Sequence, residues 1–316
     1  MATRLGVVMD PIADITPYKD TTLALLLEAM RRDYEIVYFE MSDLFVRDGV
    51  GYGTGRRLEV FDDNDDWYRF TGESEILPLA DLDTILMRKD PPFDTEYIYA
   101  TYILELAENE GTLVVNRCDA LRDVNEKMSI NRFAHLTAPT LVARRSADFK
   151  RFIAEHGDAV IKPLDGMGGS RIFRVKTGDD NISVVLEVLT EHGSRYAMAQ
   201  AYLPAIKEGD KRILVVDGVP VDYALARVPA EGELRGNLAA GGRGVGRPLT
   251  DADRAIAEEI GPYVREKGLL FVGLDVIGDK LTEINVTSPT CVRELDKQFG
   301  INIAAKLFDA IERRLA

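Results

Sequence analysis

Short apolar segments alternate with amphipathic ones along the first third of the chain. Residues 20–32 repeat apolar side chains at helical spacing, and Asp20 is suited to cap that helix. A second helical face, ended by Gly111, comprises Tyr99, Tyr102, Ile103 and Leu106. Four runs have the length of buried strands: LGVVM (5–9), EIVYFE (35–40), DTILM (83–87) and TLVVN (112–116). Strands alternating with helices predict a parallel sheet, with a polar, glycine-rich excursion at 47–75.

The pattern changes near residue 127, after which strands follow one another in pairs. The second pair is joined by Asp217 and Gly218, a dipeptide typical of hairpin turns. The three pairs are 159–163 with 171–175, 211–216 with 220–228, and 270–277 with 280–286. With amphipathic segments at 251–267 and 301–315, they predict antiparallel sheets covered by helices. The expected fold class is therefore α/β, becoming α+β in the C-terminal half, with domains at 1–126 and 127–316.

The composition limits the partners of the chain. Its 316 residues include 39 Lys and Arg against 53 Asp and Glu, a formal net charge of −14. Such a surface repels phosphate, so nucleic acids and anionic membranes are not expected partners. Cys118 and Cys291 are the only cysteines and lie in no metal-binding or disulfide pattern. Because the first apolar run is too short for a signal peptide and no run would span a membrane, we expect a cytoplasmic protein.

A glycine-rich segment, LDGMGGSR, lies between two predicted strands and contains Gly166, Gly168 and Gly169. It fits neither the dinucleotide fingerprint nor the P-loop, both of which join a strand to a helix. Glycines at a hairpin tip let backbone N–H groups approach an anion, and Lys162 just upstream lies in an apolar run that favours a placed cation. The residues alone leave a phosphate-binding flap and an ordinary glycine turn both open.

The segment GLDVIGDKLTEINVTSP (273–289) is the most informative in the chain. If the hairpin loop is Gly278 to Lys280, Ile277 faces Leu281, and Asp275, Glu283 and Asn285 project from one face. Opposed carboxylates repel each other unless a cation lies between them, and two carboxylates with an amide oxygen suit magnesium. The alternative is a solvated polar face. A two-residue loop would instead put the two acids on opposite faces.

Residues 228–248 contain six glycines together with Arg235, Arg243 and Arg247. A stretch with so few apolar side chains is expected to be mobile. It is either a disordered surface loop or a lid whose arginines meet an anionic substrate and whose closure excludes water.

The remaining candidates are less specific. The three histidines are isolated and GxSxG is absent, so covalent nucleophilic catalysis lacks its residues. The strand at 196–204 could line an adenine, with Asp210 accepting ribose hydroxyls, although these residues alone favour a core strand. Candidate carboxylate-binding groups are Arg88, Arg227 and Arg293, each of which could instead form a surface ion pair. Asp10 and the segment 88–90 follow predicted parallel strands, where ligands bind.

Taken together, these segments resemble the ATP-grasp ligases, and more specifically the bacterial glutathione synthetases. The resemblance spans the chain, and its most specific strings are IKPLDGMGGSRIFRV, AQAYLPAIKEGDKRILVVDG, RGNLAAGGRG and GLDVIGDKLTEINVTSPTCVRE. It implies a parallel-sheet pre-ATP-grasp domain, then an ATP-grasp fold with antiparallel sheets and a mobile lid at 228–248. It also implies a homo-oligomer, typically a tetramer.

The resemblance implies a role for each candidate residue. Magnesium, or manganese in its place, would be held by Asp275, Glu283 and Asn285. Phosphoryl transfer would involve Lys162, Arg212 and Arg235. ATP would contact Lys127, Lys162, Gly166, Gly168, Gly169, Ser170, Gln200, Ala201, Tyr202, Leu203, Asp210 and Arg212. The peptide and amino-acid substrates would contact Asp10, Arg88, Asp90, Arg227, Asn237, Ser288, Pro289, Thr290 and Glu294.

The implied reaction joins gamma-L-glutamyl-L-cysteine to glycine through an acyl phosphate, with ATP converted to ADP and phosphate. It needs no enzyme nucleophile, which agrees with the missing triad. Three alternatives remain at this point: an ATP-grasp ligase for another carboxylate and amine, a noncatalytic nucleotide-binding regulator, and a nicotinamide-dependent oxidoreductase.

Overall fold

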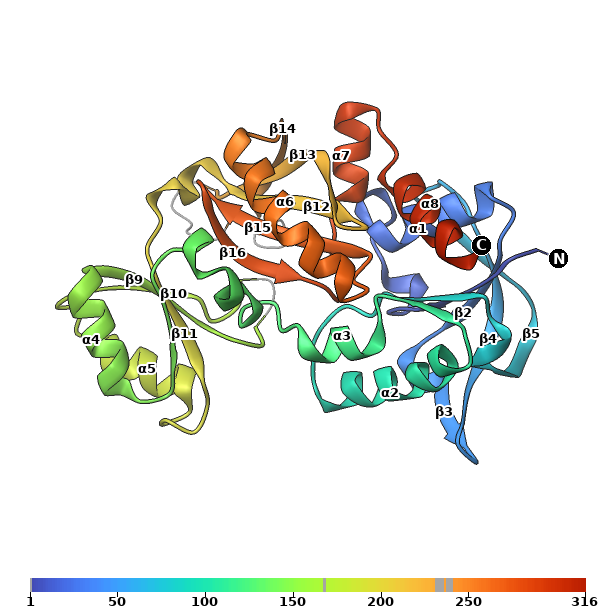
Figure 1. Cartoon of the computed structure of the whole chain (residues 1–316), viewed down its shortest axis with the longest axis horizontal. Helices are drawn as coiled ribbons and strands as arrows, with labels where there is room; N and C mark the ends of the chain where they lie inside the picture. The colour runs from blue at the N-terminus through green and yellow to red at the C-terminus, as the bar shows by residue number, and fades with distance from the viewer. Residues whose placement is uncertain (1, 167–168, 231–235, 237–240) are drawn as a thin grey trace.

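The computed structural model describes residues 2–166, 169–230, 236 and 241–316. The chain forms an elongated molecule in which an N-terminal unit and a smaller lobe lie at opposite ends of a C-terminal sheet (Figure 1). Both termini lie at the end formed by the N-terminal unit (Figure 1). Within the described ranges, no helix is long and apolar enough to cross a bilayer.

The N-terminal sheet confirms the predicted parallel arrangement. Strand β1 pairs in parallel with β2 and β6, and β6 pairs in parallel with β7. The strands of this sheet run in the order β3-β4-β2-β1-β6-β7, with β5 on β4. Their bounds are β1 (Arg4–Val8), β2 (Glu35–Phe39), β3 (Leu44–Arg47), β4 (Val50–Val60), β5 (Tyr68–Pro78), β6 (Thr84–Met87) and β7 (Leu113–Val115).

The interpretation of 47–75 as an excursion from the sheet is wrong. Most of this segment forms β4 and β5, a long antiparallel hairpin that extends the sheet beyond β2. Its glycines are needed for packing, because a Cβ on Gly53 would lie 2.5 Å from the ring of Phe39 and one on Gly55 would lie 2.4 Å from Val37. Glycine here leaves room for side chains of the adjacent strand β2. The composition of the segment nevertheless resembles that of a loop.

Two antiparallel sheets follow, as the paired strands predict. The central sheet has the order β10-β9-β11-β8, and the C-terminal sheet has the order β14-β13-β12-β15-β16. The central strands are β8 (Thr140–Ala143), β9 (Asp158–Pro163), β10 (Phe173–Lys176) and β11 (Ala197–Ala201). The C-terminal strands are β12 (Asp210–Val216), β13 (Val219–Val228), β14 (Arg243–Pro248), β15 (Phe271–Ile277) and β16 (Lys280–Asn285).

The predicted lid region is partly regular. Residues 243–248, which contain Arg243 and Arg247, form the edge strand β14 and pair with β13. Both arginines are exposed on that strand. Arg235 lies outside the described residues.

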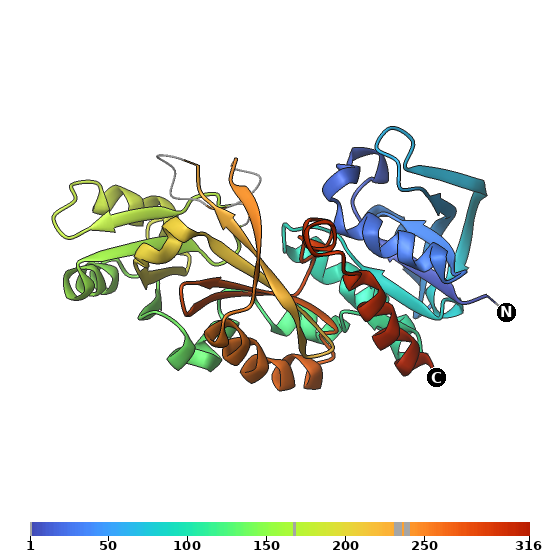
Figure 2. The ribbon, with the colours of Figure 1, turned by 90° about the horizontal axis from the view of Figure 1, so that it is seen from above.

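The helices cover these sheets, and helices from the two ends of the chain pack against each other. Asp20 caps α1 by accepting a hydrogen bond from the backbone N–H of Leu23 at 2.6 Å, as predicted. Helix α8 returns to pack beside α1, as Figure 2 shows. The helices are α1 (Thr21–Arg31), α2 (Thr95–Asn109), α3 (Cys118–Asp123), α4 (Ser146–His156), α5 (Ile182–Thr190), α6 (Asp251–Glu266), α7 (Val292–Phe299) and α8 (Ile303–Leu315).

Among the described residues, the buried apolar side chains form three clusters. Two of them combine residues of the N-terminal and C-terminal sheets, for example Phe39 with Leu274 and Leu5 with Leu214. The third lies between the central sheet and helices α4 and α5. The N-terminal and C-terminal sheets therefore share their cores, whereas most of the central sheet has a core of its own.

Candidate active site

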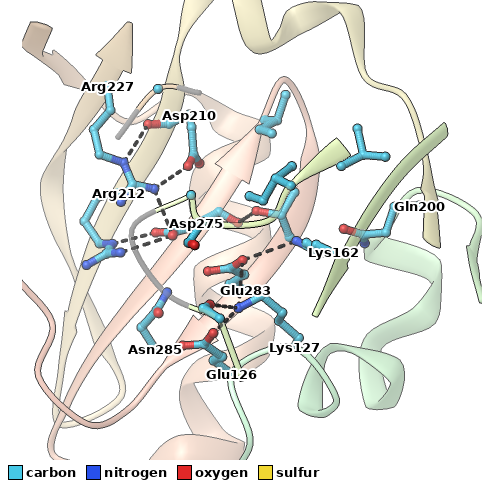
Figure 3. A pocket seen from close by; sticks show the side chains of 18 of the residues that line it. Glu126, Lys127, Lys162, Gln200, Asp210, Arg212, Arg227, Asp275, Glu283 and Asn285 are labelled. Carbon is cyan, nitrogen blue, oxygen red and sulfur yellow. Dashed lines mark hydrogen bonds and ion pairs between the residues drawn. The ribbon is translucent and has the colours of Figure 1, made fainter. Parts of the chain in front are cut away.

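A cleft of about 400 Å³ lies between the central and C-terminal sheets. Strands β9 and β11 line it from one side, and β12, β15 and β16 line it from the other. Charged side chains from both sheets point toward one another across this space (Figure 3).

The β15–β16 hairpin brings the predicted acids together, but its turn and register differ from those predicted. Asp275 faces Glu283 and Gly273 faces Asn285, as predicted. The turn, however, has two residues, so Ile277 faces Lys280 and the predicted pairing of Ile277 with Leu281 is wrong. The register shifts between Asp275 and Val276, because β16 has one extra residue there. This extra residue changes the alternation of side chains along β16. The acids therefore share the cleft face.

Asp275 lies in a buried ion-pair network with two arginines. Arg212 donates to its two carboxylate oxygens at 2.5 and 3.1 Å, and Arg227 contacts it at 2.8 Å. Burial alone would favour the neutral acid, but the two guanidinium groups hold the pKa of Asp275 well below its usual range. Asp275 is therefore a carboxylate at neutral pH.

Glu283 forms a second group of ion pairs with the two lysines. Its Oε1 lies 3.2 Å from Nζ of Lys162 and 3.4 Å from Nζ of Lys127. Although burial opposes ionisation, these ammonium groups lower the pKa of Glu283. Lys127 also donates to the carbonyl of Gly166 at 2.9 Å, which ties the glycine-rich segment to the network.

Glu126 completes this group, although it was not among the residues predicted from the sequence. Its carboxylate contacts Lys127. Burial, together with the nearby Glu283 carboxylate, raises the pKa of Glu126 to about 7. In the sequence, only its position immediately before Lys127 could have indicated that Glu126 belongs to the site.

The donors on the β15–β16 hairpin fit a hard divalent cation. The carboxylates of Asp275 and Glu283 and the amide of Asn285 all line the cleft. The amide nitrogen of Asn285 is buried and has no hydrogen-bond partner among the described residues. No hydrogen bond of that nitrogen therefore fixes the amide group of Asn285. The amide oxygen is a suitable ligand for magnesium. No cluster of three or more His, Cys, Asp or Glu suited to a metal occurs in the described ranges.

The predicted nucleotide-binding residues gather in the cleft, with one exception. Asp210 is partly buried there, and this burial raises its pKa to about 6 despite its ion pair with Arg227. Gly168 lies outside the described residues. Those that line the cleft are Lys127, Lys162, Gly166, Gly169, Ser170, Gln200, Ala201, Tyr202, Leu203, Asp210 and Arg212.

The predicted substrate-binding residues divide into three groups. Asn237, like Arg235, lies outside the described residues. Three others do not line the cleft: Asp10, Arg88 and Glu294. The remaining ones line it: Asp90, Arg227, Ser288, Pro289 and Thr290.

Arg88 is nevertheless connected to the substrate loop. Its buried guanidinium donates to Oγ1 of Thr22 at 3.2 Å and to the carbonyl of Pro289 at 3.0 Å. Oγ of Ser288 donates back to the carbonyl of Arg88 at 3.2 Å. These contacts join the end of β6 to the loop after β16. Arg88 therefore supports residues 288–289 from behind the cleft.

Asp10 is likewise connected to the cleft through the residues that it contacts. It lies 2.7 Å from Nζ of Lys89 and accepts a hydrogen bond from the backbone N–H of Asp90 at 2.9 Å. The two predicted strand-end segments are therefore in contact, although only Asp90 reaches the cleft.

Two family models cover almost the whole chain. The prokaryotic glutathione synthetase N-terminal domain matches residues 3–122, and the prokaryotic glutathione synthetase ATP-grasp domain matches residues 126–300. The chain belongs to the prokaryotic glutathione synthetase family. It is thus an ATP-dependent ligase, and the predicted resemblance is confirmed.

Curated relatives in this family match over nearly their full length. Glutathione synthetase of Escherichia coli strain K12 is 61% identical over 312 residues, covering 99% of this chain and 98% of the relative. Glutathione synthetase of Yersinia pestis is 62% identical over 314 residues, with the same coverage.

Solved structures with much lower sequence identity share the fold. A D-cycloserine synthetase has a TM-score of 0.70 at 16% identity, with 99% of this chain and all of that chain covered. D-alanyl-alanine synthetase A of Vibrio cholerae has a TM-score of 0.61 at 11% identity, with 99% and 98% covered. These likenesses support the ATP-grasp fold that the glutathione synthetase family is expected to have.

Proposed function

We propose that this chain catalyses the ATP-dependent ligation of gamma-L-glutamyl-L-cysteine to glycine, giving glutathione, ADP and phosphate. Full-length identity of about 60% with curated glutathione synthetases carries this proposal. The cleft supports it, because buried cations from two sheets face a pair of carboxylates and could bind a triphosphate between them.

The nucleotide lies, in this proposal, along the edge of β11. Gln200 to Leu203 line the adenine, and Asp210 accepts the ribose hydroxyls. Lys127 and Lys162 bind the phosphates, which lie under the glycine-rich segment. The contact between Lys127 and the Gly166 carbonyl supports this arrangement, since it already joins a phosphate-binding cation to that segment.

Glu283 and Asn285, with Asp275 beside them, would hold magnesium or manganese. Such an ion neutralises phosphate charge during phosphoryl transfer. The protein itself supplies Arg212, which lines the cleft and donates to Asp275 at 2.5 Å, and which would contact the transferring phosphoryl group. Lys162 and, from outside the described residues, Arg235 complete the proposed catalytic set.

The chemistry proceeds in two substitutions. An oxygen of the cysteinyl carboxylate attacks the γ-phosphorus, the bond from that phosphorus to the bridging oxygen breaks, and ADP leaves. The amine of glycine then attacks the acyl carbon, the carbon–oxygen bond to phosphate breaks, and the amine loses its proton. Positioning and charge neutralisation are the contributions of the protein. The loop at 288–290, supported by Arg88, would hold the peptide.

An ADP-release assay tests the proposal. We expect ADP to appear only when gamma-glutamylcysteine, glycine and ATP are all present with magnesium, and omission of any one to stop it. ADP release with another carboxylate and amine, such as two D-alanines, would instead indicate a different ligase. ATP binding without ADP release under every substrate pair would indicate a regulator.

We further propose a homotetramer located in the cytoplasm, organised as a domain at 1–126 and a domain at 127–316. The family resemblance supports the tetramer. Light scattering coupled to size exclusion measures the mass, for which a tetramer gives four times 35.1 kDa.

A further inference from the structure

Arg174, on β10, lines the cleft and is held in one orientation by an acid on the neighbouring strand. Its Nε donates to one carboxylate oxygen of Asp158 at 2.9 Å, and its Nη2 donates to the other at 2.5 Å. A bidentate pair of this kind fixes the plane of the guanidinium as well as its position. The pair uses two of the three nitrogens, and Nη1 has no hydrogen-bond partner among the described residues.

The fixed guanidinium lies over an aromatic ring. Its carbon Cζ is 3.5 Å from the centre of the Tyr202 ring. Tyr202 follows β11 and is also tied to Asp158, because its backbone N–H donates to the Asp158 carbonyl at 3.0 Å. Asp158 therefore sets the position of both partners, one through its side chain and the other through its backbone.

This layered pair borders the proposed adenine compartment. Arg174 and Tyr202 line the same cleft as Val160, Gln200 and Leu203. Aromatic rings and guanidinium planes are surfaces on which nucleobases stack. An ion pair on an open surface contributes little to stability. The stacking of Arg174 on a ring that faces a ligand cleft therefore points to a role in binding.

We propose that Arg174 and Tyr202 together form a stacking wall for the adenine base, and that Asp158 is the positioning residue that holds this wall. The inference rests on the proposed function, since it assumes that ATP binds in the cleft. Arg174 contacts the base and not the phosphates, so it determines nucleotide affinity without taking part in phosphoryl transfer.

Two ligands separate this role from a general effect on the cleft: ATP, and inorganic tripolyphosphate, which has the phosphates without the base. We expect Arg174→Ala to raise the Kd of ATP about tenfold, the usual effect of losing one stacking contact. The Kd of tripolyphosphate should stay unchanged. In turnover, the KM for ATP should rise while kcat and the KM for gamma-glutamylcysteine stay constant.

Asp158→Asn tests the positioning role, and we expect an increase in the Kd of ATP of about threefold, because the stack is loosened but not removed. Arg174→Lys keeps the charge but loses the planar fork, and it should fall between the wild type and Arg174→Ala. These two variants keep the inference testable if Arg174→Ala folds poorly.

A matched control exists on the same lobe. Arg145 binds both oxygens of Asp148 at 2.8 and 3.1 Å at the start of α4, is largely exposed and does not line the cleft. Arg145→Ala and Asp148→Asn should leave the Kd of ATP unchanged. If Arg174→Ala weakens ATP and tripolyphosphate equally, or weakens neither, the inference is overturned. If the wild type binds no ATP at all, the proposed function itself fails.

Discussion

Glu283 accepts contacts from two buried ammonium groups that are also the proposed phosphate ligands. Its Oε1 lies within 3.4 Å of both Lys127 and Lys162. A neutral amide at this position would keep the shape of the side chain but lose its attraction for a metal ion and for the lysines.

Glu283→Gln should therefore reduce turnover much more than it reduces stability. We expect kcat to fall about a hundredfold and the magnesium concentration for half-maximal rate to rise, in line with the loss of a metal-site group. The melting temperature should fall only moderately, because Glu126 still pairs with Lys127 after the substitution. ADP release measured across a magnesium titration, with melting curves, checks both parts.

Glu258→Gln is the matched control, because Glu258 is exposed on α6 and lies outside the cleft. It should leave the rate and the magnesium dependence unchanged. Normal turnover of Glu283→Gln at ordinary magnesium would contradict the metal assignment.

At the scale of elements, α6 approaches the β12–β13 turn more closely than a side chain allows. A Cβ on Gly261 would lie 2.2 Å from the carbonyl oxygen of Gly218. Gly218 in turn has φ of +73°, which favours glycine in this turn. The close approach of helix α6 to the turn therefore requires glycine at both positions.

Gly261→Ala should destabilise the protein although alanine is the better helix former. The backbone contact cannot move easily, so we expect the free energy of unfolding to fall by about 2 kcal/mol, as overpacking typically does. Denaturant unfolding measures this change. Glu258→Ala, on the exposed side of α6, should change the free energy of unfolding by less than about 0.5 kcal/mol. Equal stability of Gly261→Ala and the wild type would contradict the close approach.

Glu28 joins α1 to α8 through a buried carboxylate. It accepts from Arg31, from Arg32 at 2.7 Å and from Asn302 at 3.1 Å. The hydrogen bonds from Arg31, with smaller contributions from Arg32 and Asn302, lower the pKa of Glu28 from 4.5 to about 2. Because the folded state favours the ionised form, this group stabilises the fold above pH 4.5 and loses its contribution as the pH falls toward 2.

Glu28→Gln should thus lower the free energy of unfolding at pH 7 by about 2 kcal/mol, the usual value for hydrogen bonds to a charged group. The difference from the wild type should narrow as the pH falls below 4.5. Denaturant unfolding over a pH series gives both results. Glu73→Gln, on an exposed part of β5, is the control and should show no such difference. A difference that stays constant with pH would contradict the ionic role of Glu28.

The elements that sequence patterns predict well are those whose side chains alternate or repeat clearly. Helix α1 with its Asp20 cap and the strand pair β12–β13 with its Asp217–Gly218 turn are examples. The β4–β5 hairpin was missed because its glycines, which fit against Phe39, have the composition of a loop.

For the site, residue types were predictable and fine geometry was not. Asp275 and Glu283 are opposed as expected, but through a two-residue turn and an irregular register that spacing alone does not reveal. Arg174 carried no local signal, because its importance depends on Asp158 and on Tyr202 from another strand.

At the scale of the whole molecule, the core of the central sheet is largely separate from the other two. Ala143, Phe152, Ile161, Leu186 and Ala199 belong to a cluster that draws only on the region from 141 to 199. The N-terminal and C-terminal sheets are instead joined by shared clusters and by Asn116, whose side-chain amide donates to the Phe271 carbonyl at 2.8 Å. The central lobe should therefore open independently of the rest.

Native-state hydrogen exchange tests this organisation. We expect amides of β9 and β11 to exchange through an opening of lower free energy than those of β1 and β12, since separate cores form separate cooperative units. ATP with magnesium should slow exchange in β9 and β11, because the proposed ligand joins the two sheets. A single common free energy of opening for all four strands would contradict the separate lobe.

The buried charges of the cleft, described above as ion pairs, also determine how ligands influence one another. A triphosphate that attracts Lys127 and Lys162 leaves the Glu283 carboxylate without its counter-ions, and a divalent cation is then the natural replacement. Conversely, a cation that engages Glu283 frees both ammonium groups for an anion. If both ligands bind as proposed, thermodynamic reciprocity requires that each increases the affinity for the other by the same factor. In the proposed site, the ligand-free enzyme would therefore bind either ion alone more weakly than it binds the two together.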